Sequence, residues 1–334
     1  MEEIQELPVE DFGLAGGDKL KSACQAYTII GSLNEARDNA ILFPTRVAGR
    51  IEDNLAMVGP GRALDPTRFA IIIPALIGNG EASSPSNTTG LQSGADFPEV
   101  VIEDAVRLQH ILIVKHLRIP ALHAAVGWSM GGQQAYQWAS LFPDLVPRLA
   151  VICGAAKTSP FSRMFLTSLK AALTADAAWQ GGRYEQPPVV GLKALGRVWA
   201  PWAFSEPWYR RGGFVELGFS DLDAFVAGFW DAVPLGWDAN DILCQFDMWL
   251  RHDLGRAAGD DTTRALRAIT ARTLLMPCST DAYFQCTDSV AEAAEISSAK
   301  VVPIESDWGH MAGAGMNAAD AAFIDAHLTA LLHS

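Results

Sequence analysis

The chain has 334 residues, of which 49% are hydrophobic and 19% charged, a balance that supports a large folded core. Its 38 acidic residues outnumber 25 basic ones, the net charge is −13, and no basic run of five occurs. Such a chain repels phosphate backbones and anionic lipid surfaces, so we expect no nucleic-acid or membrane partner. No run of 18 apolar residues suggests a transmembrane helix.

Two further absences narrow the class of protein. Residues 1–11 are acidic and lack the apolar region of a secretory signal. The five cysteines are scattered and form no C-x-x-C motif, which argues for reduced thiols and against a disulfide framework or zinc site. We therefore expect a cytoplasmic protein. No phosphate-binding glycine loop and no H-E-x-x-H motif occurs, so we also expect no metal and no nucleotide-type cofactor.

In chain order, short apolar runs alternate with segments of helical periodicity. The strand-like runs are residues 40–43, 69–74, 121–126, 149–153, 272–276 and 300–304. The helical segments are residues 101–117, 133–141 and 320–332. This alternation predicts an α/β fold with a mostly parallel, doubly wound sheet.

The strand pattern disappears from residue 160 to residue 261, where helical stretches are separated by glycine and proline breaks. Seven of the ten tryptophans lie in this segment. An aromatic-rich helical insertion between two strands is typical of a lid over an active site, although the aromatics could also pack only against one another. We predict a core of residues 1–159 and 262–334 and a lid of residues 160–261.

The strongest motif is Gly-Trp-Ser-Met-Gly-Gly at residues 127–132, between a strand-like run and a helical segment. A serine on so sharp a turn needs small residues two positions away on each side, here Gly127 and Gly131. The helix start also offers free N–H groups to a developing oxyanion. The motif predicts Ser129 as the nucleophile of an α/β-hydrolase fold; an ordinary turn with a surface serine is the alternative.

A serine hydroxyl needs a base, and this fold places the histidine last in chain order, after the acid. His310 follows the run 300–304 and is preceded by Gly309, so we predict it as the base. The other histidines precede the nucleophile, fall in the insertion, or lie in or after the terminal helix: His110, His116, His123, His252, His327 and His333.

The acid that orients the imidazole should follow the strand-like run 272–276. Asp281 stands at that place. Asp288 is the main rival, but it is better explained as an early residue of a following helix. Asp307 lies too close to His310 along the loop. The sequence thus predicts a catalytic triad of Ser129, Asp281 and His310.

Two backbone N–H groups should stabilise the oxyanion. One is that of Met130, the residue after the nucleophile, and the other should come from Arg46 or Val47 in the loop after the first core strand, with Val47 preferred. We also predict substrate contacts from Trp128 and from Arg46, whose guanidinium suits an anionic group; a solvated arginine is an equally good interpretation.

Several motifs together resemble the homoserine O-acetyltransferase group of the α/β-hydrolase superfamily. They lie at residues 27–39, 59–65, 78–80, 83–87, 129–132, 279–281 and 309–310 and span nearly the whole chain. The resemblance places the group's nucleophile at Ser129, its acid at Asp281 and its base at His310. It also implies a helical lid, a narrow tunnel to the serine and a homodimer.

Three departures from that group's pattern favour a looser, hydrolase-like member. Trp128 replaces a glycine, Thr45-Arg-Val-Ala-Gly49 replaces His-Ala-Leu-Thr-Gly, and Met311-Ala-Gly313 follows the histidine in place of Asp and a Phe-Leu pair. The group's carboxylate-binding arginine has no clear counterpart, and Tyr209-Arg-Arg211 is only a place to look for it.

We therefore predict a serine hydrolase that cleaves a small or medium carboxylic ester through an acyl-enzyme. The alternative is an O-acetyltransferase that moves an acetyl group from acetyl-CoA, as co-substrate, to an alcohol such as homoserine or serine. The outcome depends on how dry the site is and how the alcohol is held. A binding protein that kept the fold without activity is a third hypothesis, disfavoured because every triad position holds a competent residue.

Overall fold

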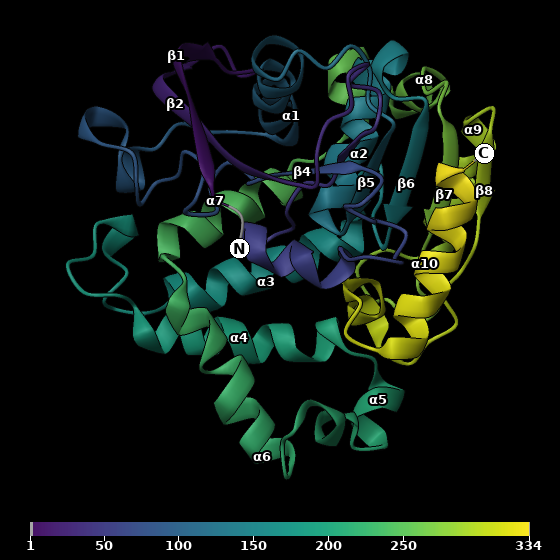
Figure 1. The fold of residues 1–334 in the computed structure, drawn as a ribbon. Helices are drawn as coiled ribbons and strands as arrows, with labels where there is room; N and C mark the ends of the chain where they lie inside the picture. The colour runs from purple at the N-terminus through teal and green to yellow at the C-terminus, as the bar shows by residue number, and fades with distance from the viewer. Residues whose placement is uncertain (1–2, 334) are drawn as a thin grey trace.

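The structure, a computed structural model, describes residues 3–333. Within them, eight strands form one sheet in the order β1-β2-β4-β3-β5-β6-β7-β8, and all pairs from β4 to β8 are parallel (Figure 1). The strands are β1 (Gln5–Gly13), β2 (Lys19–Ile30), β3 (Ala40–Leu42), β4 (Ala70–Pro74), β5 (Ala124–Trp128), β6 (Arg148–Ile152), β7 (Arg272–Met276) and β8 (Ala299–Val301). The six predicted runs correspond to β3–β8, so the predicted parallel α/β fold is confirmed.

The hairpin of β1 and β2 was not predicted. It forms an antiparallel edge of the sheet, with β2 also antiparallel to β4. Most side chains of β1 are exposed, and the first half of β2 buries only Leu20 and Ala23. Segments that face solvent on this scale have no apolar run, which is why the sequence pattern missed β1 and the first half of β2.

Five α-helices accompany the strands of the sheet in the described part of the chain: α1 (Ile102–His110), α2 (Met130–Leu141), α8 (Thr262–Arg267), α9 (Cys286–Glu295) and α10 (Ala318–Leu332). The expected helix at residues 101–117 is α1 followed by a π-helical turn, Ile111–His116. The helix after the serine begins at Met130, three residues before the predicted start at residue 133. The apolar pattern did not reveal this first turn because residues 131 and 132 are glycines. An N–H group at this start therefore lies directly beside the serine.

Five more α-helices lie between β6 and α8 in the described chain: α3 (Pro160–Thr174), α4 (Val189–Ala203), α5 (Glu206–Arg210), α6 (Leu222–Phe225) and α7 (Ala239–Leu250). In Figure 1 they gather beyond the carboxyl ends of β5 and β6, where the loops of an α/β sheet carry its site. We call residues 160–261 the helical insertion. Its role as a lid, and the division of the chain around it, remain predictions.

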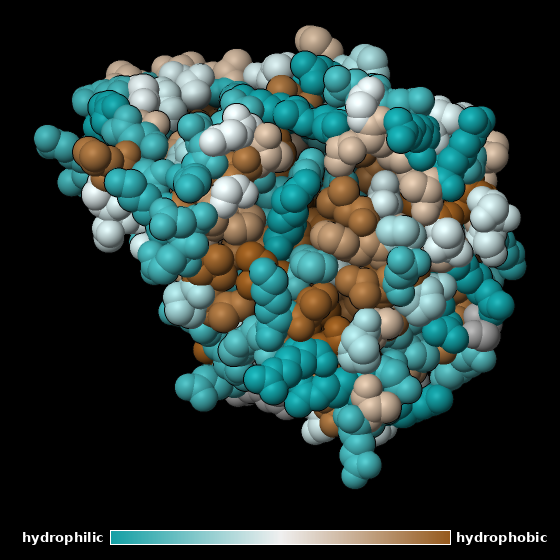
Figure 2. All heavy atoms as spheres, turned by 90° about the horizontal axis from the view of Figure 1, so that it is seen from above, coloured by the Kyte–Doolittle hydropathy of each residue, from teal (hydrophilic) through white to brown (hydrophobic). Residues whose placement is uncertain are grey.

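Buried apolar side chains from the sheet and the insertion form one continuous core. At the surface, one face carries hydrophilic side chains around its edge and apolar ones towards its middle (Figure 2). Large exposed apolar residues also occur on the insertion, among them Met164 on α3 and Val190 on α4. Among residues 3–333, no helix combines the length and the apolarity that a membrane crossing needs.

Candidate active site

Ser129 lies at a sharp bend between β5 and α2, with a φ of 58° that is unusual for a residue other than glycine. A Cβ on Gly127 would lie 2.1 Å from the carbonyl oxygen of Gly131, and one on Gly131 would lie 2.6 Å from that of Pro44. Both positions therefore accept only glycine. The tight turn presents the serine hydroxyl, which is almost fully buried, at the sheet edge.

A chain of hydrogen bonds runs from this hydroxyl to a carboxylate. The Ser129 hydroxyl lies 2.9 Å from Nε2 of His310, and Nδ1 of His310 lies 2.8 Å from Oδ2 of Asp281. The other carboxylate oxygen accepts the N–H groups of Tyr283 at 2.7 Å and Phe284 at 3.3 Å. The structure thus brings together the three residues that the sequence predicted, although they lie up to 181 positions apart.

The rival acids and the histidine of the insertion lie elsewhere. Asp288 occupies the first turn of α9, as expected, and Asp307 pairs with Arg211 of the insertion, which lowers the pKa of Asp307. His252 is buried after α7, and desolvation lowers its pKa to about 4. His310, and not His252, is hydrogen-bonded to the hydroxyl of Ser129, so His310 is the histidine positioned to act as the base.

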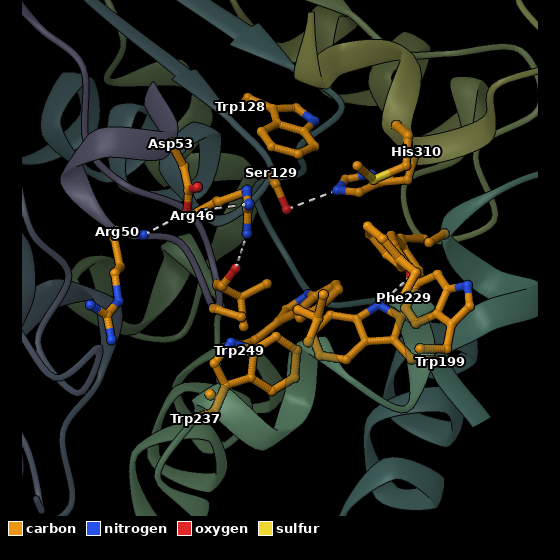
Figure 3. A pocket seen from close by; sticks show the side chains of 18 residues that line it. Arg46, Arg50, Asp53, Trp128, Ser129, Trp199, Phe229, Trp237, Trp249 and His310 are labelled. Atoms are coloured by element: carbon orange, nitrogen blue, oxygen red, sulfur yellow. Dashed lines mark hydrogen bonds and ion pairs between the residues drawn. The ribbon is translucent and has the colours of Figure 1, made fainter. Parts of the chain in front are cut away.

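A cavity of about 370 Å³ opens in front of Ser129 (Figure 3). On one side lie residues from the sheet loops: Arg46, Val47, Trp128, Ser129 and His310. On the other side lie aromatic residues of the insertion: Trp199, Phe229, Trp230, Trp237 and Trp249. Five of the aromatic side chains that the sequence left open as lid or local core therefore contribute to the wall of this cavity.

The arginines of the cavity are Arg46 and Arg50, in the loop after β3. Arg46 donates to the carbonyl oxygen of Val47 at 2.9 Å, approaches a carboxylate oxygen of Asp53 at 3.5 Å and lies 5.2 Å from the centre of the Trp128 ring. Burial lowers the pKa of Arg46, and Asp53 opposes that shift. Because an arginine guanidinium stays protonated in proteins, Arg46 places a positive charge in the wall of the cavity that contains Ser129.

The segment Tyr209-Arg-Arg211 does not supply a cavity arginine. Arg211 is held by Asp307 and Glu216, and Arg210 by Glu206. The suggestion to look there for a carboxylate-binding arginine is therefore wrong for this chain. The physical reason is that its guanidinium groups are already neutralised by acidic partners outside the cavity.

The two N–H groups predicted for the oxyanion are available for a ligand. Met130 is the first residue of α2, so its N–H has no acceptor within the helix. The N–H of Val47 donates to no other group of residues 3–333. The loop of Val47 is held by buried Gln245 of α7, which accepts from the N–H of Ala48 at 2.7 Å and donates to the carbonyl oxygen of Gly78 at 2.9 Å.

Sequence reasoning missed Gln245, since a glutamine on a helix of the insertion carries no motif. It missed Tyr283 as well, whose ring lies 4.6 Å from that of His310 and whose hydroxyl accepts from Nε1 of Trp199 at 2.6 Å. A signal for Tyr283 was present, because it follows the predicted acid by two residues. Gln245 could be found only once the fold brought α7 to the loop.

Cys153, Asp281 and His310 offer three ligand-type atoms within 4.8 Å of one another. Burial raises the pKa of Cys153 well above its usual value, so its thiol is protonated, whereas metal binding needs a thiolate. Asp281 and His310 are already joined by a hydrogen bond. These donors fit the hydrogen-bonded chain better than a metal site, and the expected lack of a metal remains a prediction.

Known proteins are similar to this chain in both sequence and fold. Residues 59–200 match the α/β hydrolase fold family. An ethyl acetate hydrolase of Pseudomonas veronii is 37% identical over 334 residues, which cover 99% of this chain and 94% of that protein. The chain belongs to the α/β-hydrolase superfamily.

Two further similar proteins represent the two kinds of enzyme that resemble this chain. The crystal structure of an acetylester hydrolase from Corynebacterium glutamicum matches with a TM-score of 0.97 and 33% identity, over 99% of this chain and 96% of that one. A homoserine O-acetyltransferase of Trichormus variabilis is 31% identical over 323 residues, 92% of this chain and 88% of that protein. The resemblance to that group is confirmed, and its relatives include ester hydrolases.

Proposed function

We propose that this α/β hydrolase cleaves small or medium carboxylic esters through a Ser129–His310–Asp281 triad and an acyl-enzyme intermediate. The observation that carries the proposal is the unbroken hydrogen-bond chain from Ser129 to Asp281, which faces a largely aromatic cavity. Two similar proteins are named for the hydrolysis of acetate esters. Together, a competent nucleophile and an apolar cavity favour a neutral ester as substrate.

In the first half of the reaction, Oγ of Ser129 forms a bond to the ester carbonyl carbon while Nε2 of His310 takes the hydroxyl proton. Negative charge then develops on the carbonyl oxygen, where the N–H groups of Met130 and Val47 would donate to it. The bond to the alkoxy oxygen breaks, and His310 returns the proton to the departing alcohol. Asp281 stabilises the transient imidazolium.

In the second half, water attacks the acyl carbon. His310 accepts a proton from that water, the tetrahedral intermediate collapses, and the proton returns to Oγ of Ser129 as the carboxylic acid leaves. No electron acceptor or resident cofactor is needed, so we propose none. The volume of about 370 Å³ lies near the lower end of ligand cavities, which favours small substrates.

A second candidate is acetyl transfer from acetyl-CoA to an alcohol such as homoserine or serine. The 31% identity to a homoserine O-acetyltransferase favours it. The acyl-enzyme would be the same, and only the acceptor would differ. The indole of Trp128 beside Ser129 leaves less room for a polar acceptor, which is why we rank hydrolysis first.

The decisive experiment offers the purified enzyme ethyl acetate, phenyl acetate and acetyl-CoA, each with and without homoserine, and follows acetate and ester products. We expect acetate from both esters and no dependence on homoserine. Turnover of acetyl-CoA that requires homoserine would replace the first proposal with the second. No turnover of any of the three by enzyme with an intact Ser129 would reject both.

The cellular setting is part of the same proposal. All five cysteines are free, which supports a reducing compartment such as the cytoplasm. The family resemblance supports a homodimer, which sedimentation of the purified protein would test. A sedimentation coefficient of a monomer at micromolar concentration would reject that part.

A further inference from the structure

We propose that Trp128 is a positioning residue that fixes the ring of His310, and that Gly313 is a glycine in order to leave room for the indole. The inference rests on the proposed role of His310 as the base. It concerns a residue that the sequence suggested only as a substrate contact. Its support comes from ring geometry and from the space around Gly313.

Three aromatic rings surround the imidazole of His310. The indole of Trp128 is stacked on it at 5.3 Å with an angle of 26° between the planes. The rings of Tyr283 and Phe284 lie at 4.6 and 5.5 Å and meet it at 65° and 43°. Tyr283 and Phe284 belong to the acid's loop, whereas Trp128 is the residue directly before Ser129. The stacked ring therefore ties the base to the nucleophile's own strand.

Gly313 lies one turn after His310 in a 3-10 helix, Gly309–Ala314. Residues three apart in such a helix lie one above the other, so a side chain at position 313 would point to the same side as the imidazole. A Cβ there would lie 2.5 Å from Cδ1 and Nε1 of Trp128 and 3.1 Å from Sγ of Cys153. Gly313 has no positive φ, so its backbone does not require glycine, but the indole does.

The stack can act on the base in two ways. It restricts rotation of the imidazole away from the plane in which Nε2 reaches Ser129, which maintains the 2.9 Å hydrogen bond. Its electron-rich face also favours the imidazolium that forms when His310 takes the proton. The charged groups around this pair are Asp281, bonded to Nδ1, and Arg46, on the Trp128 ring; Cys153 nearby is a neutral thiol.

The test compares two replacements of Trp128. Trp128→Phe keeps an aromatic face, and Trp128→Leu fills space without one. We expect kcat for ester hydrolysis to fall about tenfold in W128L and less than about threefold in W128F, with KM nearly unchanged in both. The acid limb of the pH profile of kcat/KM should move to lower pH by about half a unit in W128L only, because the imidazolium loses its aromatic partner.

A second variant tests whether the space left by Gly313 is needed for the indole of Trp128. Gly313→Ala should displace the indole from its stack on His310 and lower kcat about tenfold in the wild-type background, yet less than about twofold in W128L, where the crowded ring is absent. The matched control is Gly16→Ala, since a Cβ at Gly16 meets no atom within 4 Å. Equal losses from Gly313→Ala in both backgrounds would overturn the proposed link between Gly313 and Trp128.

Labelling of Ser129 by a fluorophosphonate separates this inference from the proposed function, because the probe needs an activated serine but no natural ester. The labelling rate and its pH dependence should follow the same order, with W128L slower than W128F. If W128L labels as fast as W128F with an unmoved acid limb, Trp128 only packs. If wild-type enzyme labels but cleaves no ester, the proposed function fails while the test of Trp128 stands; an enzyme that does not label overturns both.

Discussion

The sheet and the helical insertion each contribute one side of the cavity, and they do so by different physical means. On the sheet side, the serine and the acid lie in the loops after β5 and β7, and the base lies in the 3-10 helix that follows β8; steric crowding and backbone hydrogen bonds leave these segments few alternatives. On the insertion side, the wall consists of large rings held by other rings, such as Trp199 against Trp237 and Phe246. Chemistry is thus specified locally, while the shape of the cavity depends on packing between distant segments.

The two regions are nevertheless connected at the site. Gln245 of the insertion holds the loop of Val47, and Trp199 donates to the hydroxyl of Tyr283 in the acid's loop. Gly309 lies so close to the backbone of Ser205 that a Cβ would come within 2.9 Å of its nitrogen. Each of the loops around Ser129 therefore has a contact in the insertion, so a change there can alter catalysis as well as substrate choice.

The largest expected effect comes from the sheet side. Ser129→Ala should lower kcat by about 10⁵-fold or more, because no other hydroxyl of residues 3–333 is hydrogen-bonded to His310 to replace the nucleophile. Hydrolysis of phenyl acetate measures the loss, and thermal unfolding should show a folded protein. A residual rate within tenfold of wild type would mean that another residue is the nucleophile, and the conclusion that the sheet side carries the chemistry would be wrong.

The second largest effect should be on the free energy of unfolding, and it concerns a buried carboxyl near the start of the insertion. Glu292 of α9 is buried, where its carboxylate accepts from the N–H of Ala156, just before the insertion begins, and from the hydroxyl of Tyr136. Burial raises its pKa from 4.5 to about 7. The native state thus keeps a proton that the unfolded chain loses, and this group's contribution to stability falls as the pH rises through that interval, by about 3 kcal/mol.

Glu292→Gln should remove this dependence. Relative to wild type, the variant should gain free energy of unfolding between pH 4.5 and pH 7, measured by urea unfolding at several pH values. Glu185→Gln, at an exposed site, is the control and should leave the profile unchanged. Parallel stability profiles for E292Q and wild type would show that Glu292 is ionised in both the folded and the unfolded chain.

The same division explains what could be predicted from the sequence. Gly127 and Gly131 flank a serine for steric reasons that act within five residues, so the nucleophile was readable from a short motif. His310 and Asp281 followed from chain order once the fold class was known. The hairpin of β1 and β2 could not be read, because β1 and the first half of β2 are largely solvated and bury few side chains.

The residues of the cavity wall could not be predicted from the sequence, for a different reason. The sequence showed that seven tryptophans fall in the insertion, but not which of them face Ser129. Trp199 lines the cavity whereas Trp208, nine residues later, packs against Phe204 at 4.0 Å and lies outside it. Which neighbour a ring meets depends on how the helices cross, and that is decided by all their contacts together.

A moderate effect should come from the insertion side. Trp237 lines the cavity, so Trp237→Ala should enlarge it and raise KM for ethyl acetate about tenfold while kcat stays within about threefold. The rise in KM should be smaller for butyrate esters than for acetate esters. Trp179→Ala removes a ring that contacts Tyr184 in a tilted arrangement outside this cavity and serves as the control. If kcat falls in W237A and KM does not change, the wall supports the catalytic groups rather than the substrate.

The smallest effect should come from an ion pair that joins the two regions. Asp307, three residues before the base, is bonded by Arg211 of the insertion, and both side chains are about one-third exposed. Because solvent screens such a pair, Asp307→Asn should cost only about 0.5 kcal/mol of stability. If the pair also holds the loop of His310, kcat should fall about twofold at low salt and the difference should disappear at about 1 M salt.

A matched pair decides between these roles. Asp231 bonds Arg197 entirely within the insertion, so Asp231→Asn removes a similar ion pair without touching the loop of the base. It should leave kcat unchanged at every salt concentration. An equal, salt-independent loss of kcat in D231N and D307N would mean that the insertion acts on the site as one body; a loss confined to D307N would mean that Arg211 acts through the loop of His310 alone.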